Sequence, residues 1–462
     1  MRVLTWLFLL VQVAGCSSRS LPNADAQWPA TGDDAGMSDL PTSAPTLSPC
    51  PSPAWQEPTE IISFSDRHAT APSMVVLNSG SGGEPAKVAV QSFASGGSSW
   101  LHPDLQIARV SLGQGPWPKL VQVDKQPMLL GSHAHGWGEM ARTAQGLALA
   151  WYGDPIMNQG HPRLRRLDSS TWKASPAVEV WTSGEAVLGL ASGKDTTGEH
   201  FAIGWRDVQV GGKAATARPQ LALLDAQGKV TAGPWPAAPA EPYPGRTATL
   251  IWSGSTYLAA LGYERCDSGG APCQPRSVGV LRVDPAGPPT PVAWFPAAAN
   301  GTPGRRVALS VLGESVWVAW FEGGATDDAP RSVHLARLAR AGATVAGPLQ
   351  VANGAHPSTA LRLAATPFGL VLLWAEEGDK QLAPDQPGHS RLVLVWLDLD
   401  GKPLHGSRTL AVTRVDTYNA PDVVAVQEPP SVLLLWSGTS RKAAQVHDVA
   451  HLAGMDCSGG YK

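Results

Sequence analysis

The feature that most constrains this 462-residue sequence is a unit that recurs along almost its whole length. Its clearest copy, residues 307–351, contains four apolar or alternating segments at 307–312, 316–321, 333–338 and 344–351, and glycine-containing turns follow the first and third. Short alternating segments are typical of strands, and short turns favour antiparallel pairing. The unit therefore predicts one twisted sheet of four strands.

Two marks recur with this unit and give the number of copies. An aromatic residue closes the second predicted strand, and the Asp-x-x-Gly turn that follows the third strand requires Gly at a position of positive φ. The turns are Asp225 with Gly228, Asp284 with Gly287 and Asp398 with Gly401. The aromatic markers, whose numbers differ successively by 58, 54, 58, 57, 54 and 62, are Phe93, Trp151, Trp205, Tyr263, Trp320, Trp374 and Trp436. We expect seven copies, with six or eight left open because the copies are irregular.

The first residues carry an export signal. Arg2 is the only early positive charge, residues 3–13 form an apolar run too short to span a bilayer, and residues 13–16 read Val-Ala-Gly-Cys. This resembles a bacterial lipoprotein signal with its lipobox, which implies a signal peptide at 1–15 and lipid on Cys16. Serines at 17 and 18 favour, by the same resemblance, the outer membrane or cell surface. A plain secretory signal with an incidental cysteine is the alternative.

Residues 16–58 separate this signal from the repeats. They are rich in Ser, Pro, Ala and Gly and have no apolar period, so we expect a flexible tether. A coil of roughly 40 residues has an end-to-end distance of about 35 Å. The repeat domain, 59–462, is therefore expected to stand clear of its membrane anchor.

Four cysteines remain besides Cys16, and they fall into two natural pairs. Cys266 and Cys273 flank one loop, whereas Cys50 precedes the first strand and Cys457 follows the last. The second pair meets only if the chain closes on itself, and a disulfide there would stabilise it by roughly 4 to 5 kcal/mol on the chain-entropy model. Disulfides are typical of exported proteins, with free thiols as the alternative.

Ring closure also explains the two ends of the repeat region. Residues 60–65 resemble a fourth strand, and the last copy, 421–452, has only three. A chain whose N-terminal strand completes its last sheet resembles the β-propeller fold, specifically the propeller lipoproteins of bacteria, over residues 59–457. WD40 and kelch motifs do not recur. Residues 168–172, Asp-Ser-Ser-Thr-Trp, resemble the Asp-box of sialidase-like propellers, but once and without its glycine, so we treat the match as chance.

Composition agrees with an all-β chain. There are 49 glycines and 41 prolines, charged residues make up only 16%, and no segment has a helical period. Without Arg2 of the signal, 34 basic residues face 38 acidic ones. This near balance gives no reason to expect nucleic acid as a partner. We expect a monomer without a cofactor.

In a propeller, the loops that enter the first strands share one face with the loops that leave the second strands, so polar residues there are candidate ligand-binding groups. Long exit loops at 92–104, 206–218 and 376–390 favour the same face. Six copies each bring one hydrogen-bond donor to the entry position: His68, His135, Arg246, Arg305, His356 and Asn419. Carboxylates follow the aromatic markers at Asp154, Asp207, Glu264, Glu322 and Glu376.

These groups allow two interpretations. They brace the loops, or they bind a polyhydroxylated or carboxylated ligand. His133 and His135 have no third partner at metal-ligand spacing, and the carboxylates form no compact calcium loop, so no metal site is expected.

Three functions stay open. The first is a binding or scaffolding propeller for a protein or glycan at the cell envelope. The second is a glycoside hydrolase or lyase, although no acid and base pair can be assigned and Tyr418 stands alone as a conceivable nucleophile. No catalytic residue is therefore assigned. The third is a structural envelope protein without a dedicated ligand.

Overall fold

The computed structural model divides into two units, Met1–Thr46 and Leu47–Lys462, and every residue that it describes belongs to the second. The predicted signal, tether and cysteine pairs (Cys16, Cys50, Cys266, Cys273 and Cys457) lie outside the described residues. The described ranges are 58–62, 67–78, 86–96, 104–112, 120–123, 128–131, 134–153, 161–182, 184, 186–207, 218–237, 244–265, 274–296, 307–323, 330–358, 361–366, 369–404, 407–415, 421–426, 431–442 and 445–456.

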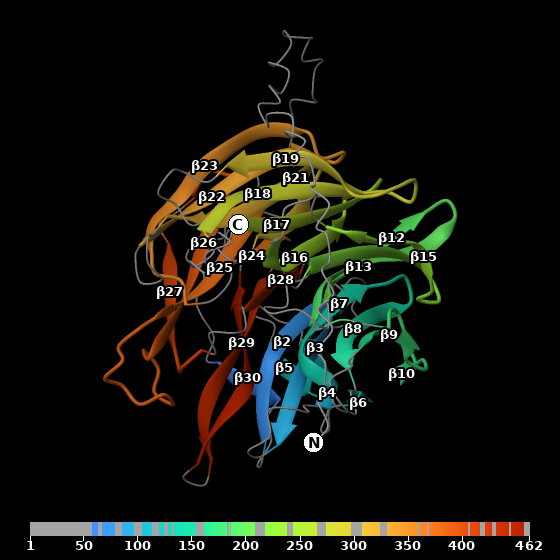
Figure 1. Cartoon of the computed structure of the whole chain (residues 1–462). Coiled ribbons are helices and arrows are strands. Elements are labelled where there is room, and N and C mark those ends of the chain that lie inside the picture. The colour runs from blue at the N-terminus through green and yellow to red at the C-terminus, as the bar shows by residue number, and fades with distance from the viewer. Residues whose placement is uncertain are drawn as a thin grey trace, which may run out of the picture. The chain divides into compact units, whose positions relative to one another are not determined.

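The described strands form seven antiparallel sheets, here called blades 1 to 7 (Figure 1). Blade 1 contains β2 (Arg67–Asn78), β3 (Lys87–Gly96), β4 (Asp104–Leu112), β5 (Leu120–Val123) and β6 (Met128–Gly131). Blade 2 contains β7 (Ala134–Arg142), β8 (Gly146–Gly153), β9 (His161–Asp168), β10 (Lys173–Ala174) and β11 (Val178–Glu179). Blade 3 contains β12 (Ala186–Asp195), β13 (Gly198–Asp207), β14 (Arg218–Asp225) and β15 (Val230–Pro236).

The next three blades repeat the four-stranded pattern without additions. Blade 4 contains β16 (Pro244–Trp252), β17 (Tyr257–Arg265), β18 (Gln274–Val283) and β19 (Thr290–Pro296). Blade 5 contains β20 (Ala308–Leu312), β21 (Ser315–Glu322), β22 (Arg331–Ala339) and β23 (Thr344–Ala355). Blade 6 contains β24 (Arg362–Thr366), β25 (Gly369–Glu377), β26 (Ser390–Leu397) and β27 (Arg408–Val412).

Blade 7 joins the two ends of the repeat region. It contains β28 (Asp422–Val426), β29 (Ser431–Lys442), β30 (Gln445–Asp456) and, as its outermost strand, β1 (Thr59–Ile62). β1 pairs antiparallel with β30, with Thr59 opposite Leu452. In Figure 1 the red β29–β30 hairpin lies beside the blue strands of blade 1, and β2 contacts both β28 and β30. The chain is a seven-bladed β-propeller closed by its N-terminal strand, which confirms the predicted fold and closure.

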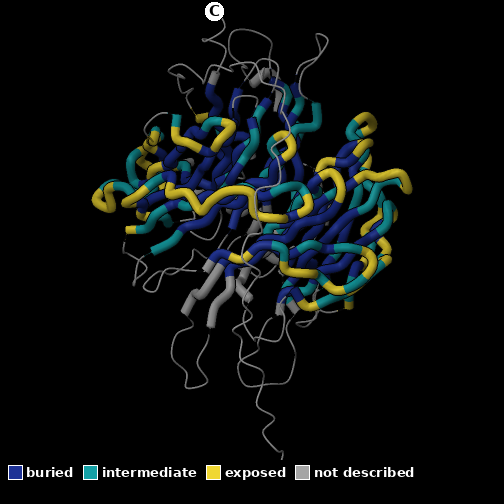
Figure 2. Tube along the Cα trace, turned by 90° about the horizontal axis from the view of Figure 1, so that it is seen from above, coloured by how far each residue is buried: buried dark blue, intermediate teal, exposed yellow. Residues whose placement is uncertain are grey.

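The aromatic markers predicted from spacing lie in the second strand of every blade. Five of them, Trp151, Trp205, Trp320, Trp374 and Trp436, are almost completely buried. They belong to apolar clusters that fill the seams between neighbouring blades. Figure 2 shows in dark blue that much of the strand backbone belongs to buried residues. Among the described residues there is one such cluster for each of the seven neighbouring pairs of blades. Burial between sheets therefore explains the regular tryptophan spacing.

The predicted Asp-x-x-Gly turns are present, but one of them differs. Gly228 and Gly401 have φ of 85° and 79°, and each donates its N–H to the carbonyl oxygen of the Asp three residues earlier. Gly287 does not adopt positive φ, so that part of the prediction is wrong for blade 4. There Asp284 accepts hydrogen bonds from Thr256 Oγ1 and Arg282 Nε, so its side chain is bound to the neighbouring strands.

Candidate functional site

The predicted ligand-binding residues that the structure describes lie on the face where the chain enters first strands and leaves second strands, here called the mouth face. His68, His135 and Arg246 lie in the innermost strands β2, β7 and β16, and Asp207 and Glu264 lie at the ends of β13 and β17. Arg305, Asn419 and Asp154 lie outside the described residues. Side-chain geometry is described for three of the predicted residues, His356, Glu322 and Glu376.

Glu376 is the centre of the best-defined polar group on the mouth face. Its Oε1 accepts hydrogen bonds from the His356 backbone N–H (3.1 Å) and the Trp374 indole N–H (2.9 Å), and its Oε2 lies 3.3 Å from Arg391 Nη2. Trp374 and Glu376 alternate with Ala375 along β25, so both side chains point to one side of the strand. Glu376 is buried, whereas 47% of the Arg391 side chain is exposed. One buried carboxylate therefore fixes an entry loop, a core indole and a surface cation.

The long loop that leaves β25, residues 378–389, is tied down on both sides. Its backbone closes on itself through Gly378 N–H to His389 O and Asp379 N–H to Gly388 O, both at 2.9 Å. Asp385 in this loop binds Arg441 of blade 7 at 2.7 Å, and that guanidinium lowers the pKa of the carboxyl below its usual range. This predicted binding loop is thus a fixed bridge between blades 6 and 7.

A second hydrogen-bonding contact holds the same loop to blade 7. The Pro384 carbonyl oxygen accepts from the Arg414 N–H at 2.7 Å and from the Thr439 hydroxyl. Because Arg414 precedes blade 7 and Thr439 lies in β29, the loop is held at the seam between the blades. Such a surface is preorganised, which reduces the entropy that a ligand must offset on binding.

Glu322 occupies in blade 5 the place that Glu376 has in blade 6, two residues after the marker tryptophan. Its Oε2 lies 3.5 Å from His334 Nε2 on the neighbouring strand β22. The His334 ring stacks on Trp320 at 5.8 Å between centroids, and Trp320 stacks on Phe295 of blade 4 at 4.9 Å. The carboxylate is thereby joined to a buried aromatic column.

Polar side chains also brace the inner strands around the channel. Asp422, the first residue of β28, accepts a 2.8 Å hydrogen bond from the Met74 backbone N–H of blade 1, and its other oxygen lies 3.9 Å from Arg362 Nε of blade 6. Gln91 of blade 1 donates to the Gly138 carbonyl of blade 2 at 2.7 Å. These contacts satisfy backbone groups of innermost strands, which have no further strand to pair with.

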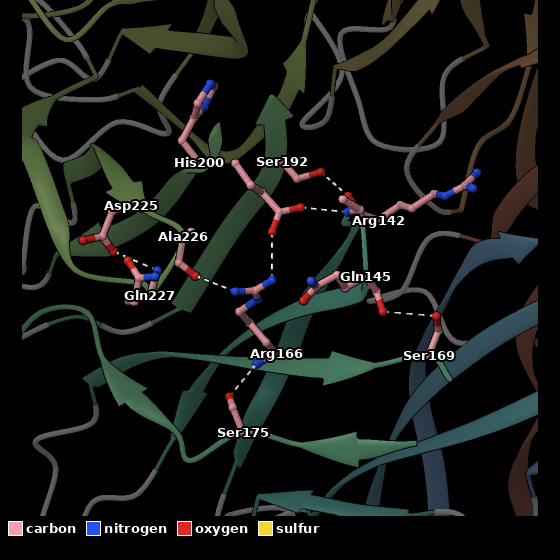
Figure 3. Close-up of polar contacts among 12 residues, drawn as sticks. Arg142, Gln145, Arg166, Ser169, Ser175, Ser192, His200, Asp225, Ala226 and Gln227 are labelled. Carbon is pink, nitrogen blue, oxygen red and sulfur yellow. Dashed lines mark hydrogen bonds and ion pairs between the residues drawn. The ribbon is translucent and has the colours of Figure 1, made fainter. Parts of the chain in front are cut away.

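The opposite face, formed by the hairpins within each blade, carries a separate network that Figure 3 shows. Glu199 accepts from the Ala144 N–H at 2.8 Å and from Arg166 Nη2 at 2.9 Å, and Arg166 also donates to the Ala226 carbonyl at 3.0 Å. The network thus joins hairpins of blades 2 and 3. Both Glu199 oxygens accept from protein donors, as a structural brace requires.

An aromatic group continues this brace to blade 4. The Tyr257 hydroxyl lies 2.7 Å from His200 Nδ1 and donates to the His200 carbonyl, while the Trp252 ring packs against both rings at 4.8 Å. Burial raises the pKa of Tyr257 far above its usual value. A Cβ on Gly193 would lie within 2.8 Å of the His200 ring, the Trp252 ring and the Tyr257 hydroxyl, so only glycine fits there.

The Asp-box-like segment has a local role in blade 2. Asp168 Oδ1 accepts hydrogen bonds from the backbone N–H and hydroxyl groups of Ser170 and Thr171, which lower its pKa to about 2. Trp172 packs under the Arg109 guanidinium at 5.1 Å. The segment forms the turn after the third strand, where the Asp-x-x-Gly turns lie in other blades.

Sequence reasoning missed Arg391 and the donors that surround Glu376. Arg391 is directly opposite Glu376 across the β25–β26 ladder, but this register cannot be read from spacing along the chain. The Trp-x-Glu pattern at 320–322 and 374–376 was a usable signal, because residues two apart in a strand share a face. Among the described residues, no three His, Cys, Asp or Glu side chains are grouped as metal ligands, and no helix there is long and apolar enough to cross a bilayer.

No family model and no curated protein matches the chain. Solved structures of similar fold include an α-L-arabinanase of Penicillium chrysogenum, with 10% identity and a TM-score of 0.46 over 88% of this chain and 99% of that one. Others are a PL25 ulvan lyase, with 10% identity and 0.40 over 76% and 79%, and the endosialidase of phage phi92, with 12% identity and 0.43 over 86% and 68%. The likeness is one of fold alone, and one propeller fold serves many functions.

Proposed function

We propose that this chain is a lipid-anchored recognition propeller of the cell envelope that binds a carboxylate-bearing glycan at the mouth face of blades 6 and 7. The observation that carries the proposal is the position of Arg391, a half-exposed guanidinium held by the buried carboxylate of Glu376. A guanidinium fixed in this way presents its remaining N–H groups in a planar fork that suits a carboxylate. The neighbouring entry loop brings His356, an exposed predicted donor, to the same carboxylate.

The geometry of Glu376 favours binding over hydrolysis. Glycoside hydrolases use one carboxyl group to transfer a proton and a second carboxylate as base or nucleophile. Glu376 accepts two hydrogen bonds on Oε1 and binds Arg391 through Oε2, so both oxygens are occupied by protein donors. Glu322 is likewise joined to His334. Both described mouth carboxylates thus act as positioning groups.

The distribution of apolar side chains favours a glycan over a protein as the ligand. Protein interfaces usually centre on buried aromatic or aliphatic anchors. Among the described residues, the exposed large apolar side chains, Trp294, Val345, Leu349 and Leu399, lie in the outermost strands β19 and β23 and in the turn after β26. The described mouth of blade 6 instead presents Arg391, His356 and the polar loop 378–389. Directional hydrogen bonds to hydroxyl and carboxylate groups suit such a surface.

Binding of a defined polymer tests the mouth-face proposal. Isothermal titration of the chain with polygalacturonate should show binding that weakens with salt. Arg391→Ala should weaken it about 10- to 150-fold, as expected for one charge-assisted contact of about 1.5 to 3 kcal/mol. Arg282→Ala is the matched control, because this side chain is 42% exposed and lies on the opposite face beside Asp284. Equal loss in both variants, or no binding of polygalacturonate, would refute the proposal.

Anchoring is a separate part of the proposal and rests on the lipobox ending at Cys16. The tether would place the propeller at the membrane as a monomer, on the periplasmic side of the outer membrane or on the cell surface. Labelled palmitate should enter the chain expressed in bacteria and be lost in Cys16→Ser. Incorporation that persists in Cys16→Ser, or is absent from the wild type, would refute lipidation at this residue.

A further inference from the structure

The blade that closes the ring contains a buried histidine whose ring makes no well-formed hydrogen bond. His451 in β30 is only 7% exposed, and neither of its ring nitrogens makes a hydrogen bond of normal geometry. Its ring stacks on the marker tryptophan Trp436 with 5.4 Å between centroids and 17° between planes. Buried imidazoles are usually satisfied, so this one requires an explanation.

Blade 5 contains the corresponding histidine in a different electrostatic setting. His334 also lies opposite its marker tryptophan and stacks on it, but it has Glu322 on the neighbouring second strand at 3.5 Å. In blade 7 the residue two after the marker is Gly438, and a Cβ there would lie 2.7 Å from the His451 ring. The histidine therefore fills the space where blades 5 and 6 carry a carboxylate.

The acid that faces His451 comes instead from the N-terminal strand. Glu60 in β1 is the residue directly opposite His451 in the ladder, and its carboxylate accepts a hydrogen bond from the Ser440 hydroxyl of β29. In blade 5 the fourth-strand residue opposite His334 is Gln350, which is uncharged. Blade 7 thus differs from blade 5 in placing the acid on the strand that closes the ring.

The other described charged groups near His451 are already paired. Asp448 on β30 lies 3.4 Å from Arg414, which precedes β28. On β29 the charged residues are Arg441, which binds Asp385, and Lys442, and both lie at the hairpin end of the strand. Burial lowers the pKa of His451 against the smaller opposing effects of Glu60 and of the Thr439 backbone. An imidazolium here would lose its hydration, and Glu60 and the Thr439 backbone would offset only part of that loss.

We propose that His451 makes the closure of the ring sensitive to pH, so that protonation of this histidine loosens β1 from β30. β1 is the part that gives way because it has only four residues and its register shifts between Glu60 and Ile62. Since the pKa is lower in the closed ring than the ordinary value of 6.5, closure is fully stable above about pH 6.5 and weakens as the pH falls below it. Acidification would thereby weaken the pairing of β1, which follows the predicted tether in the sequence. This effect does not depend on what the mouth face binds.

Hydrogen exchange of the full chain tests this inference. Between pH 7.5 and pH 5, after correction for the intrinsic exchange rate, the protection of peptides that cover β1 should fall, by at most tenfold per pH unit because one proton is involved. His451→Phe keeps the stacked ring and removes the proton site, so protection of β1 should then be independent of pH. Glu60→Gln removes a group that favours the proton in the closed ring, so the loss of protection should still begin near pH 6.5 and should be at least as large at pH 5 as in the wild type.

The matched control is His334→Phe, which alters the same stack in a blade that does not close the ring. This variant should keep the wild-type pH response of β1. A β1 that exchanges equally at both pH values in the wild type would overturn the inference, and so would a response that persists in His451→Phe. If His451→Phe does not fold, His451→Gln replaces it under the same criteria.

Discussion

The turn glycines give the sharpest quantitative prediction about the fold. Three of them separate the cost of a left-handed backbone conformation from the cost of crowding the seam between blades. Gly401 has φ of 79°, and a Cβ on it would lie 2.7 Å from both Leu335 Cδ2 and Trp317 Cζ3 of blade 5. For Gly401→Ala the left-handed conformation costs about 1 kcal/mol, and crowding the packed seam adds about 1 to 3 kcal/mol. We expect a loss of about 2 to 4 kcal/mol.

Two further glycines serve as controls. Gly313 has φ of 58° with nothing near its Cβ position, so Gly313→Ala should cost only about 1 kcal/mol. Gly287 has neither positive φ nor a close neighbour, so Gly287→Ala should change stability by less than about 0.5 kcal/mol.

Thermal unfolding followed by calorimetry measures the series. With an unfolding entropy of about 2.1 cal/mol/K per residue over roughly 400 residues, the Gly401 variant should melt about 2 to 5 °C lower than the wild type. The Gly313 variant should melt about 1 °C lower, and the Gly287 variant should be unchanged within error. Equal melting temperatures for the Gly401 and Gly287 variants would show that neither the positive φ of Gly401 nor its packing against blade 5 requires glycine at that position.

Three other expectations concern the polar braces. Because the Asp385 pKa is lowered by Arg441, the tie between loop 378–389 and blade 7 should be present above about pH 4 and lost as the pH falls through the lowered value; proteolysis within 378–389 that did not rise in acid would contradict this. Tyr257→Phe should lower the free energy of unfolding by about 1 to 3 kcal/mol, because it removes the hydroxyl that donates to the part-buried His200 carbonyl; denaturant titration with an unchanged midpoint would speak against the brace. Asp168→Ala should remove four local hydrogen bonds and speed backbone exchange in residues 168–174, and unaltered exchange would show that the turn holds without them.

The blade architecture could be predicted because its physical cause is local and periodic. Alternating strands such as Val316 to Phe321 and one buried aromatic per unit repeat at intervals that only a set of similar sheets produces. The N-terminal donation of β1 followed from counting, since the last copy lacked a fourth strand. Gly287 was the exception, because the bonds of Asp284 to Thr256 and Arg282 depend on contacts outside the Asp-x-x-Gly pattern.

The site was harder to predict because its geometry depends on register between strands. Glu376 was selected from its place after Trp374, but its ion-pair partner Arg391 comes from the next strand across a long loop. The same limit applies to His451, whose distinctive setting arises from a strand almost four hundred residues earlier in the chain. Spacing along one strand identifies which side chains share a face, whereas cross-strand partners require the folded ladder.

A double-mutant cycle on polygalacturonate binding tests the central claim most directly. If Glu376 acts through Arg391, Glu376→Gln should weaken binding in the wild-type background and have no further effect once Arg391→Ala is present. Dissociation constants for the Arg391→Ala variant and the double variant should then agree within about threefold, with a coupling energy above about 0.5 kcal/mol. If Glu376→Gln weakens binding by the same factor in both backgrounds, the two residues act independently and the preorganised mouth face is not the basis of recognition.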